Sequence, residues 1–338
     1  MGQCYFSGSN SGAGFHNYFD GITPSWESLT RYFLIKGGPG VGKSTLMKQV
    51  AKKAEEAGEE VERFYCSGDP DSLDGVRLVK RGIVFADATS PHAMDPQFPG
   101  AVEEIVSLGD YIERDTIVKY RSEIEELTRK NKQSYGRAYA FLGAAAVLER
   151  QRQKEIASCV DGKLVKRVAE ELVGGQDFSG VIRERKLFLD AVSCKGRVQF
   201  TETLKTAKKC YKLTGEGKDV LADLLCREVG YDRKECFYSP LCPDRMWHLL
   251  LRNAGIAVTI RDSVSGEEID SERFLIKDWD KTVKAYEKEA RRLEEEAMEC
   301  LASCKKIHDE LEEIYKSNVD FGAVTAHTER LLSLVFSE

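Results

Sequence analysis

The stretch Gly37-Gly38-Pro39-Gly40-Val41-Gly42-Lys43-Ser44-Thr45 matches the pattern G-x-x-x-x-G-K-[ST]. In this pattern the glycines let successive backbone N–H groups point inward at phosphate oxygens, and the following helix adds the positive end of its dipole. The lysine contributes a charge toward the β- and γ-phosphates, and the serine hydroxyl can ligate Mg²⁺. We therefore expect this loop to bind ATP with Mg²⁺. The expected nucleotide-binding residues are Gly37, Gly38, Pro39, Gly40, Val41, Gly42, Lys43, Ser44 and Thr45.

The residues around the loop predict alternating strands and helices. The apolar or alternating stretches 32–35, 61–66 and 82–86 are the expected strands, and 43–57 is the expected helix. A second, short helix is expected to begin with Asp69 as its N-cap and Pro70 at its first position. This order of elements predicts a parallel sheet with right-handed crossovers, as in P-loop NTPases.

A nucleotide site of this type needs a second carboxylate near the metal, at the end of a neighbouring apolar strand. Asp87 ends such a strand, so we expect Ser44 and Asp87 to hold Mg²⁺. Ala88 follows where many P-loop ATPases have a water-activating Glu, so another group has to polarise the attacking molecule. For Asp87, Asp69, Asp74 and His92, an ordinary turn or cap role is the alternative. The candidate catalytic residues are Lys43, Asp87, Asp69, Asp74 and His92.

The chain contains an internal repeat. Phe64-Tyr65-Cys66 recurs as Phe237-Tyr238-Ser239, and Gly82-Ile83 recurs at the same offset as Gly255-Ile256. This recurrence indicates two tandem copies of one architecture, divided near residue 185. The expected domains are a nucleotide-binding head (1–110), a helical arm (111–185), a degenerate head (186–278) and a C-terminal arm (279–338).

The second copy does not repeat the glycine-rich loop. It reads Leu213-Thr214-Gly215-Glu216-Gly217-Lys218-Asp219, which is shorter and has no Ser or Thr after the lysine. We therefore expect no triphosphate site there. The candidate residues change with the loop: Asp69, Asp74, Asp87 and His92 become Cys242, Trp247, Ile260 and Ser265.

Each arm contains a long helix with apolar residues at alternating steps of three and four. In the second copy these positions run from Val283 to Ile314, and in the first copy from Ile117 to Leu148. Such coiled-coil-like helices either project from the heads as antiparallel hairpins or pack on each other, and a helical layer without a stalk is the alternative. We expect the arms to offer a surface to a protein partner.

Composition excludes several classes of protein. The chain has 338 residues and a net charge of -6, which gives no general attraction to nucleic acid or anionic lipid. No apolar stretch approaches the roughly 20 residues that cross a bilayer, so we expect a cytoplasmic protein without a membrane span. The ten cysteines contain no C-x-x-C pair, which favours reduced thiols over a zinc site. The sequence leaves the oligomeric state open.

The loop, the segment 66–74, the segment 87–92 and Pro99-Gly100-Ala101-Val102-Glu103-Glu104 together resemble a family of bacterial tandem P-loop ATPase-like proteins. The resemblance spans essentially the whole chain and implies binding of ATP and Mg²⁺, without supplying a substrate. Members of that family often keep two recognisable P-loops. This chain departs from them by the loss of the second, which argues against a cycle with two ATP sites.

The expected function is therefore that of a Mg²⁺-dependent ATPase with one active site in the first head and a pseudo-site in the second. One alternative is a kinase for a small molecule or nucleotide, in which Arg114, Arg121 or Arg129 of the first arm serves as a lid residue. Solvated helix faces are the simpler explanation for those arginines. Another alternative is a scaffold that binds ATP without turnover.

Overall fold

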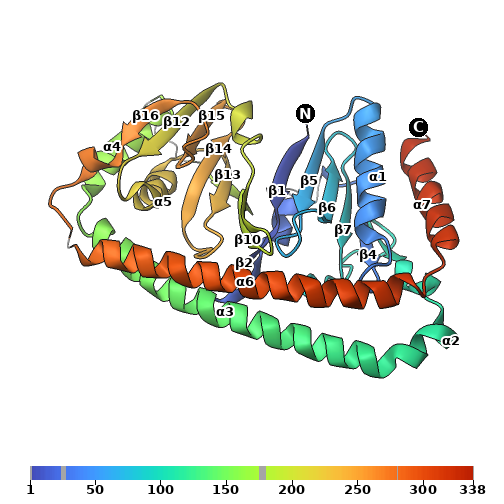
Figure 1. Cartoon of the computed structure of the whole chain (residues 1–338). Coiled ribbons are helices and arrows are strands. Elements are labelled where there is room, and N and C mark those ends of the chain that lie inside the picture. The colour runs from blue at the N-terminus through green and yellow to red at the C-terminus, as the bar shows by residue number, and fades with distance from the viewer. Residues whose placement is uncertain (1, 24–27, 175–179, 280, 338) are drawn as a thin grey trace.

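The computed structural model describes residues 2–23, 28–174, 180–279 and 281–337. Residues 1, 24–27, 175–179, 280 and 338, which belong to the expected heads and arms, lie outside the described residues. In the described chain, two α/β heads stand side by side on a pair of long antiparallel helices (Figure 1). The prediction of a duplicated α/β architecture is confirmed.

The two heads have sheets of the same topology. In the described residues each main sheet has six strands, ordered β1-β5-β6-β7-β4-β8 in the first head and β9-β13-β14-β15-β12-β16 in the second. The strands of the first sheet are β1 (Gln3–Phe6), β5 (Val61–Tyr65), β6 (Leu73–Leu78), β7 (Ile83–Asp87), β4 (Arg31–Lys36) and β8 (Glu103–Ser107). The strands of the second are β9 (Arg183–Leu187), β13 (Arg233–Tyr238), β14 (Met246–Leu251), β15 (Ile256–Thr259), β12 (Lys209–Thr214) and β16 (Glu267–Asp270).

Each head also carries a β-hairpin directly after its first strand. The hairpins are β2 (Gly8–Ser11) with β3 (Gly14–Asn17), and β10 (Asp190–Ser193) with β11 (Gly196–Gln199). At the start of the hairpins, Phe6 and Phe188 exchange two backbone hydrogen bonds of 2.9 and 3.0 Å. This reciprocal pair relates the equivalent residues of the two copies across the contact between the heads.

The sheets are mixed, so the prediction of a parallel sheet is wrong. Strand β6 runs antiparallel to both of its neighbours, β5 and β7. No helix begins at Asp69; its carbonyl accepts a hydrogen bond from Ser72 N (2.9 Å) in a turn that reverses the chain into β6. All six residues of β6 are buried, Asp74 and Arg77 among them, and the helix was expected because Asp69 and Pro70 suit the start of one.

The helices continue the duplication. Helices α1 and α5 follow the equivalent strands β4 and β12, whereas α3 and α6 are the long arm helices. Helices α2, α4 and α7 are shorter than the arm helices, and 3-10 turns connect several elements. Their bounds are α1 (Lys43–Glu56), α2 (Arg114–Ile117), α3 (Arg121–Ala157), α4 (Gly162–Leu172), α5 (Lys218–Glu228), α6 (Thr282–Lys316) and α7 (Phe321–Phe336). The 3-10 turns are η1 (Phe19–Ile22), η3 (Leu108–Tyr111), η4 (Val118–Tyr120), η5 (Leu204–Thr206) and η6 (Ser271–Phe274).

The arms pack on each other beneath both heads (Figure 1), which confirms one of the two predicted arrangements. The contact is built from small and apolar residues that include Ala138 and Ala145 of α3 with Ala290, Ala297 and Leu301 of α6. Small side chains let the two helices approach closely. The described part of the chain contains no helix with the length and apolarity that a membrane span requires.

The arms also carry a helix to the opposite head. Helix α4 follows α3 and packs in the core of the second head, whereas α7 follows α6 and packs beside α1 in the first (Figure 1). Equivalent aspartates begin the two helices: Asp161 accepts hydrogen bonds from the first turn of α4, and Asp320 does so for α7. Each head is therefore completed by the other copy.

This exchange makes Leu331 of α7 part of the first head's core, where it is 5% exposed. We expect Leu331→Ala to lower the free energy of unfolding by about 2 kcal/mol, the lower end of the range for a buried leucine, because α7 lies at the surface of the core. Urea denaturation measures the change. Leu334→Ala is the matched control, since Leu334 is 49% exposed and its truncation should have little effect. Equal effects of the two variants would contradict the packing of α7 described above.

The two heads share a core and a buried network of charges. Tyr5 and Phe64 of the first head pack with Leu187, Phe237 and Leu250 of the second. The guanidinium of Arg185 donates hydrogen bonds of 2.8 and 2.7 Å to the carboxylate of Glu62, which also accepts one of 3.0 Å from Arg77. The heads are thus joined by apolar packing and by ion pairs that water does not reach.

Candidate functional site

The glycine-rich loop lies at the end of an interior strand of the first sheet, β4. Strand β4, which lies between β7 and β8, ends at Lys36, and α1 begins at Lys43. The side chain of Val41 is fully buried in the core and anchors the loop from below. The remaining loop residues are partly exposed at the edge where β4 and β7 both end.

Two glycines of the loop adopt backbone conformations that favour glycine. Gly40 has φ +70° and Gly42, the residue before α1, has φ +100°. An L-residue with a side chain is strained in this left-handed region. The six-residue connection 37–42 therefore turns tightly before the N-terminal end of α1, where unpaired N–H groups can receive an anion.

The lysine that follows the loop folds back over it. Lys43 Nζ donates hydrogen bonds to the carbonyl oxygens of Gly37 (3.0 Å) and Gly38 (2.8 Å), and it lies 3.7 Å from Asp87 Oδ2. Its ammonium group is therefore held between the loop and the end of β7. An anion in the loop would meet this positive charge.

The two expected metal ligands lie on the same edge of the sheet. The Ser44 hydroxyl accepts a hydrogen bond of 3.0 Å from Leu73 N at the start of β6. Asp87 accepts hydrogen bonds from the backbone N–H (2.9 Å) and the hydroxyl of Thr89, while its Oδ2 faces Lys43. The structure thus brings Lys43 and Asp87 together directly, with Ser44 one residue further along α1. Hydroxyl and carboxylate oxygens are ligands that Mg²⁺ accepts.

Asp74 and His92 form a buried pair behind this edge. They are 4% and 7% exposed, and His92 Nε2 lies 3.4 Å from Asp74 Oδ2. Burial raises the pKa of Asp74 to about 6, against the lowering effect of His92, and the charges of Asp87 and Lys43 also act on this carboxylate. Cys66 lies beside the pair, and burial raises the pKa of its thiol.

Asp69 is held in a different way. Its carboxylate accepts hydrogen bonds from Asp71 N (3.2 Å) and the Ser72 hydroxyl (3.3 Å), and it forms an ion pair of 3.3 Å with Lys305 of α6. These contacts give Asp69 a role in the turn and in the docking of α6.

Two of the candidate lid arginines, Arg121 and Arg129, form ion pairs with Glu125 and Glu126 on their own exposed helix.

The C-terminal end of α6 covers the loop, which the sequence did not indicate. A Cβ atom added to Gly38 would lie 2.8 Å from the Tyr315 ring. One added to Gly40 would lie 3.0 Å from both the Glu312 carbonyl and the Lys316 side chain. Heptad spacing identifies the face of α6 that packs on α3, but it contains no signal for which residues at the helix end meet another element.

The equivalent place in the second head is closed. Only three residues, 215–217, connect β12 to α5, and the Glu216 carbonyl accepts a hydrogen bond of 2.7 Å from the Ser271 hydroxyl. Lys218 forms an ion pair of 2.8 Å with Asp262. Asp219, which stands where the first head has Ser44, is paired with Arg152 of α3. Lys218 and Asp219 thus both form ion pairs with residues outside the loop.

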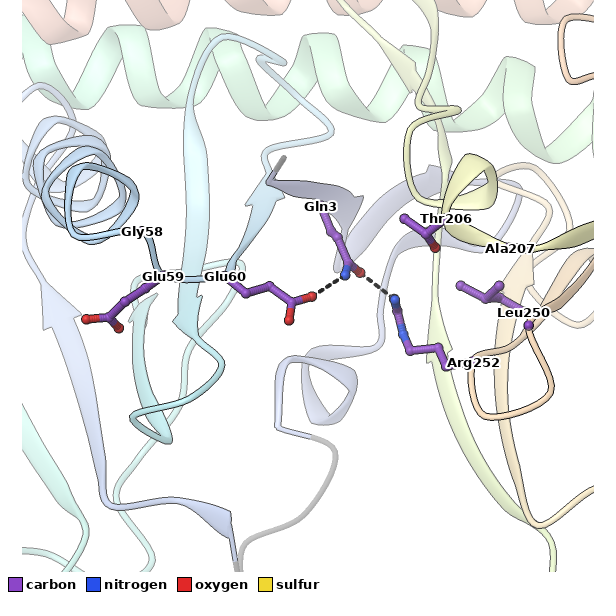
Figure 2. Close-up of a pocket in the computed structure, with 9 residues that line it drawn as sticks. Gln3, Gly58, Glu59, Glu60, Thr206, Ala207, Leu250 and Arg252 are labelled. Atoms are coloured by element: carbon purple, nitrogen blue, oxygen red, sulfur yellow. Dashed lines mark hydrogen bonds between the residues drawn. The ribbon is translucent and has the colours of Figure 1, made fainter.

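A cavity of about 500 Å³ lies elsewhere, between the two heads. Figure 2 shows Gln3 in its centre, linked to Glu60 on one side and to Arg252 on the other. Gly58 and Glu59, beyond the C-terminal end of α1, also line it, so it is separated from the glycine loop by the length of that helix. No described lining residue belongs to the predicted site.

Comparison with known proteins gives one partial similarity. Residues 22–144 match the model of a family described as "Nephrocystin 3, N-terminal". The matched range covers a little over a third of the chain and includes β4, the glycine loop, α1, Asp74, Asp87 and His92. No curated protein matches the chain, and no solved structure matches it. The similarity is therefore to that family's N-terminal region, and it spans the part of the chain in which the candidate site lies.

Proposed function

We propose that this protein binds Mg-ATP at the loop 37–45 of the first head and hydrolyses it, and that the second head is a pseudo-site. The observation that carries the proposal is the contrast between equivalent loops. In the first head, Lys43 and Asp87 converge on a six-residue glycine-rich turn that the end of α6 contacts. In the second, the shorter loop is closed, and the two charged residues that follow it are paired elsewhere, Lys218 with Asp262 and Asp219 with Arg152.

The proposed roles follow from chemistry and position. Backbone N–H groups of the loop and the N-terminal end of α1 hold the phosphates, with Lys43 on the β- and γ-phosphates. Ser44 and Asp87 hold Mg²⁺. Asp74 and His92 form the buried pair behind this edge of the first sheet, whereas Asp69 acts in the turn that meets α6. The domain boundaries at 110, 185 and 278 belong to this proposal.

The arms provide a route from the nucleotide to the rest of the molecule. The end of α6 contacts Gly38 and Gly40, and α6 packs along α3 to the second head. A phosphate in the loop would press on the same glycines. We propose that a protein partner recognises the arms in a nucleotide-dependent way.

All ten cysteines are free, which suits a reducing compartment such as the cytoplasm.

A kinase is the second candidate, and one observation favours it. Ala88, at the position after Asp87, is 1% exposed, and its N–H bonds to Ile35, so this position offers no water-activating side chain. Phosphate release from ATP alone supports hydrolysis, whereas consumption of ATP only after addition of a metabolite supports a kinase. Tight binding of ATP with no turnover under either condition supports a non-hydrolysing scaffold.

Asp87→Asn tests the metal part of the proposal. We expect Mg²⁺ to tighten ATP binding by wild-type protein at least about tenfold, and we expect the variant to lose most of this gain because a neutral amide is a weaker ligand for Mg²⁺. Titration of a fluorescent ATP analogue with and without Mg²⁺ measures both values. Asp262→Asn, which removes the carboxylate paired with Lys218, is the matched control. An undiminished Mg²⁺ effect in Asp87→Asn would rule out this role.

A further inference from the structure

Three side chains of different types converge at the loop end of the first sheet. Cys66 follows β5, Asp74 lies near the start of β6, and His92 follows β7. These three strands are neighbours, and β6 is antiparallel to the other two. The end of β5, the start of β6 and the end of β7 therefore meet at one edge. One potential ligand atom from each residue lies within 4.8 Å of the other two.

The spacing of the histidine and the carboxylate is unsuitable for a hydrogen bond. A good N–H···O bond joins heavy atoms about 2.7–3.2 Å apart, whereas His92 Nε2 and Asp74 Oδ2 are 3.4 Å apart. Among the described residues, Asp74 Oδ2 is buried without a hydrogen-bond partner, and so is His92 Nδ1, the ring nitrogen that does not face Asp74. Buried polar atoms without partners are uncommon and costly in folded proteins.

The same spacing suits two ligands of one metal ion. Nitrogen and oxygen ligands at about 2.0–2.1 Å from a tetrahedral ion lie about 3.4 Å apart, and a thiolate at about 2.3 Å lies about 3.6 Å from either. The nitrogen and oxygen are at this distance already. The sulfur, at up to 4.8 Å, needs a displacement of about 1 Å. The rings of Phe15 and Phe19 meet the His92 ring edge-on at 5.0 and 4.8 Å and hold its orientation.

We propose that Cys66, Asp74 and His92 bind one transition-metal ion of the zinc class, with a water molecule in the fourth position. A set of one thiolate, one carboxylate and one imidazole selects Zn²⁺ or Co²⁺ over the oxygen-preferring Mg²⁺ and Ca²⁺. The charges of the thiolate and the carboxylate balance those of a divalent ion, so the buried site is neutral when loaded. The site is separate from the Mg²⁺ expected at Ser44 and Asp87.

The duplication provides an internal comparison. At the offset of 173 residues, the equivalents of the three ligands are Ser239, Trp247 and Ser265. The second head thus lacks the thiol, the carboxylate and the imidazole together, and it also lacks the longer glycine-rich loop. From the absence of a C-x-x-C pair, the sequence predicted that there is no zinc site. Spacing along the chain does not reveal ligands that lie in or after three separate strands.

Cobalt binding tests the proposal directly. Protein without a histidine tag, reduced and freed of metal by a chelator, is titrated with Co²⁺ in the absence of nucleotide. We expect one Co²⁺ per chain, with a thiolate-to-cobalt charge-transfer band and the visible bands of a tetrahedral site. Cys66→Ser should lose the charge-transfer band, whereas Cys210→Ser, which changes a thiol of the second head, should keep it. No band in the wild type, or an undiminished band in Cys66→Ser, would overturn the proposal.

Zinc affinity and thermal stability give independent measurements. In competition with a chromophoric chelator, Asp74→Asn and His92→Gln should each bind Zn²⁺ at least about tenfold more weakly than wild type. Zn²⁺ should raise the Tm of wild type and Cys210→Ser but not that of the folded ligand variants, because only a bound ion stabilises the folded state. Unchanged Zn²⁺ affinity in both Asp74→Asn and His92→Gln would contradict the assignment.

The metal site does not rest on the proposed function, and the two can fail separately. Metal binding is measured without nucleotide, and ATP binding is measured without Zn²⁺. A protein that binds ATP but no Co²⁺ would exclude the metal site alone. A protein that binds Co²⁺ through Cys66 but no ATP would exclude the nucleotide site alone.

Discussion

Lys43→Ala is expected to weaken binding of Mg-ATP by about 30- to 150-fold. The ammonium group of Lys43 lies over the loop, within 3.0 Å of the carbonyls of Gly37 and Gly38 and 3.7 Å from Asp87. In the complex it would exchange these contacts for phosphate oxygens. Hydrogen bonds between charged groups contribute about 1.5–3 kcal/mol each, and the loss of one strong bond of this kind, about 2–3 kcal/mol, gives a change of this size.

The duplication supplies the matched control for this experiment. Lys218→Ala removes the lysine at the start of α5, which is paired with Asp262 at 2.8 Å. We expect it to leave ATP affinity unchanged, because the loop before it is three residues shorter and closed. Equilibrium titration with a labelled ATP analogue compares both variants with wild type. Equal affinities for wild type and Lys43→Ala would show that the nucleotide, if bound, is bound elsewhere.

Glu62→Gln is expected to lower the free energy of unfolding by about 3–5 kcal/mol. Glu62 is 3% exposed and accepts hydrogen bonds from Arg185 and Arg77. Removing one partner of a buried ion pair leaves the opposite charges without compensation in a region that water does not reach. Because Arg185 belongs to the second copy, the loss falls on the contact between the heads. Urea denaturation followed by circular dichroism measures the change.

The stability difference between wild type and Glu62→Gln should depend on pH. Burial alone would raise the pKa of Glu62, but the guanidinium groups of Arg185 and Arg77 outweigh it and bring the pKa to about 2. A carboxylate with a lowered pKa contributes stability that is present above its unfolded value, about 4.5, and is lost as the pH falls toward 2. This lowering of the Glu62 pKa corresponds to a contribution of about 3 kcal/mol to the free energy of unfolding.

The control for this second prediction is Glu125→Gln, at an exposed i,i+4 pair with Arg121 on α3. Exposed pairs of this kind contribute little, so we expect no measurable change. If Glu62→Gln were as stable as Glu125→Gln, or if its difference from wild type did not shrink between pH 4.5 and pH 2, the buried network would not stabilise the contact between the heads.

Local elements of the fold could be predicted from the sequence because their signals are local. Strand β4, helix α1 and strand β7 follow from apolar stretches bounded by glycine, and their observed bounds agree with the predicted ones to within about a residue. The repeat at 173 residues predicted the shared topology of the heads. Strand β6 was not predicted, because Asp69 and Pro70 have the pattern of a helix start, whereas the pairing of β6 with β5 and β7 depends on contacts between separate segments.

The parts that depend on contacts between distant segments could not be predicted. Nothing in the α7 sequence shows that its apolar face covers α1 of the other copy. Tyr315 lies directly after the last heptad position, Ile314. The heptad pattern explains how α6 packs on α3, but it does not indicate the contact between Tyr315 and Gly38. Glu62 reads as a solvent-facing residue within a strand, and only the position of Arg185 makes it buried and paired. In the sequence, Cys66 is part of the internal repeat and Asp74 and His92 are candidates for catalysis, and only the fold brings the three side chains together.

A crystal structure with a non-hydrolysable ATP analogue and Mg²⁺ tests the central proposal most directly. The account predicts one triphosphate per chain, with its phosphates against the backbone of residues 37–45 and its metal between Ser44 and Asp87. Phosphates bound at residues 215–219, or a loop 37–45 without nucleotide at millimolar concentrations of the analogue, would contradict it.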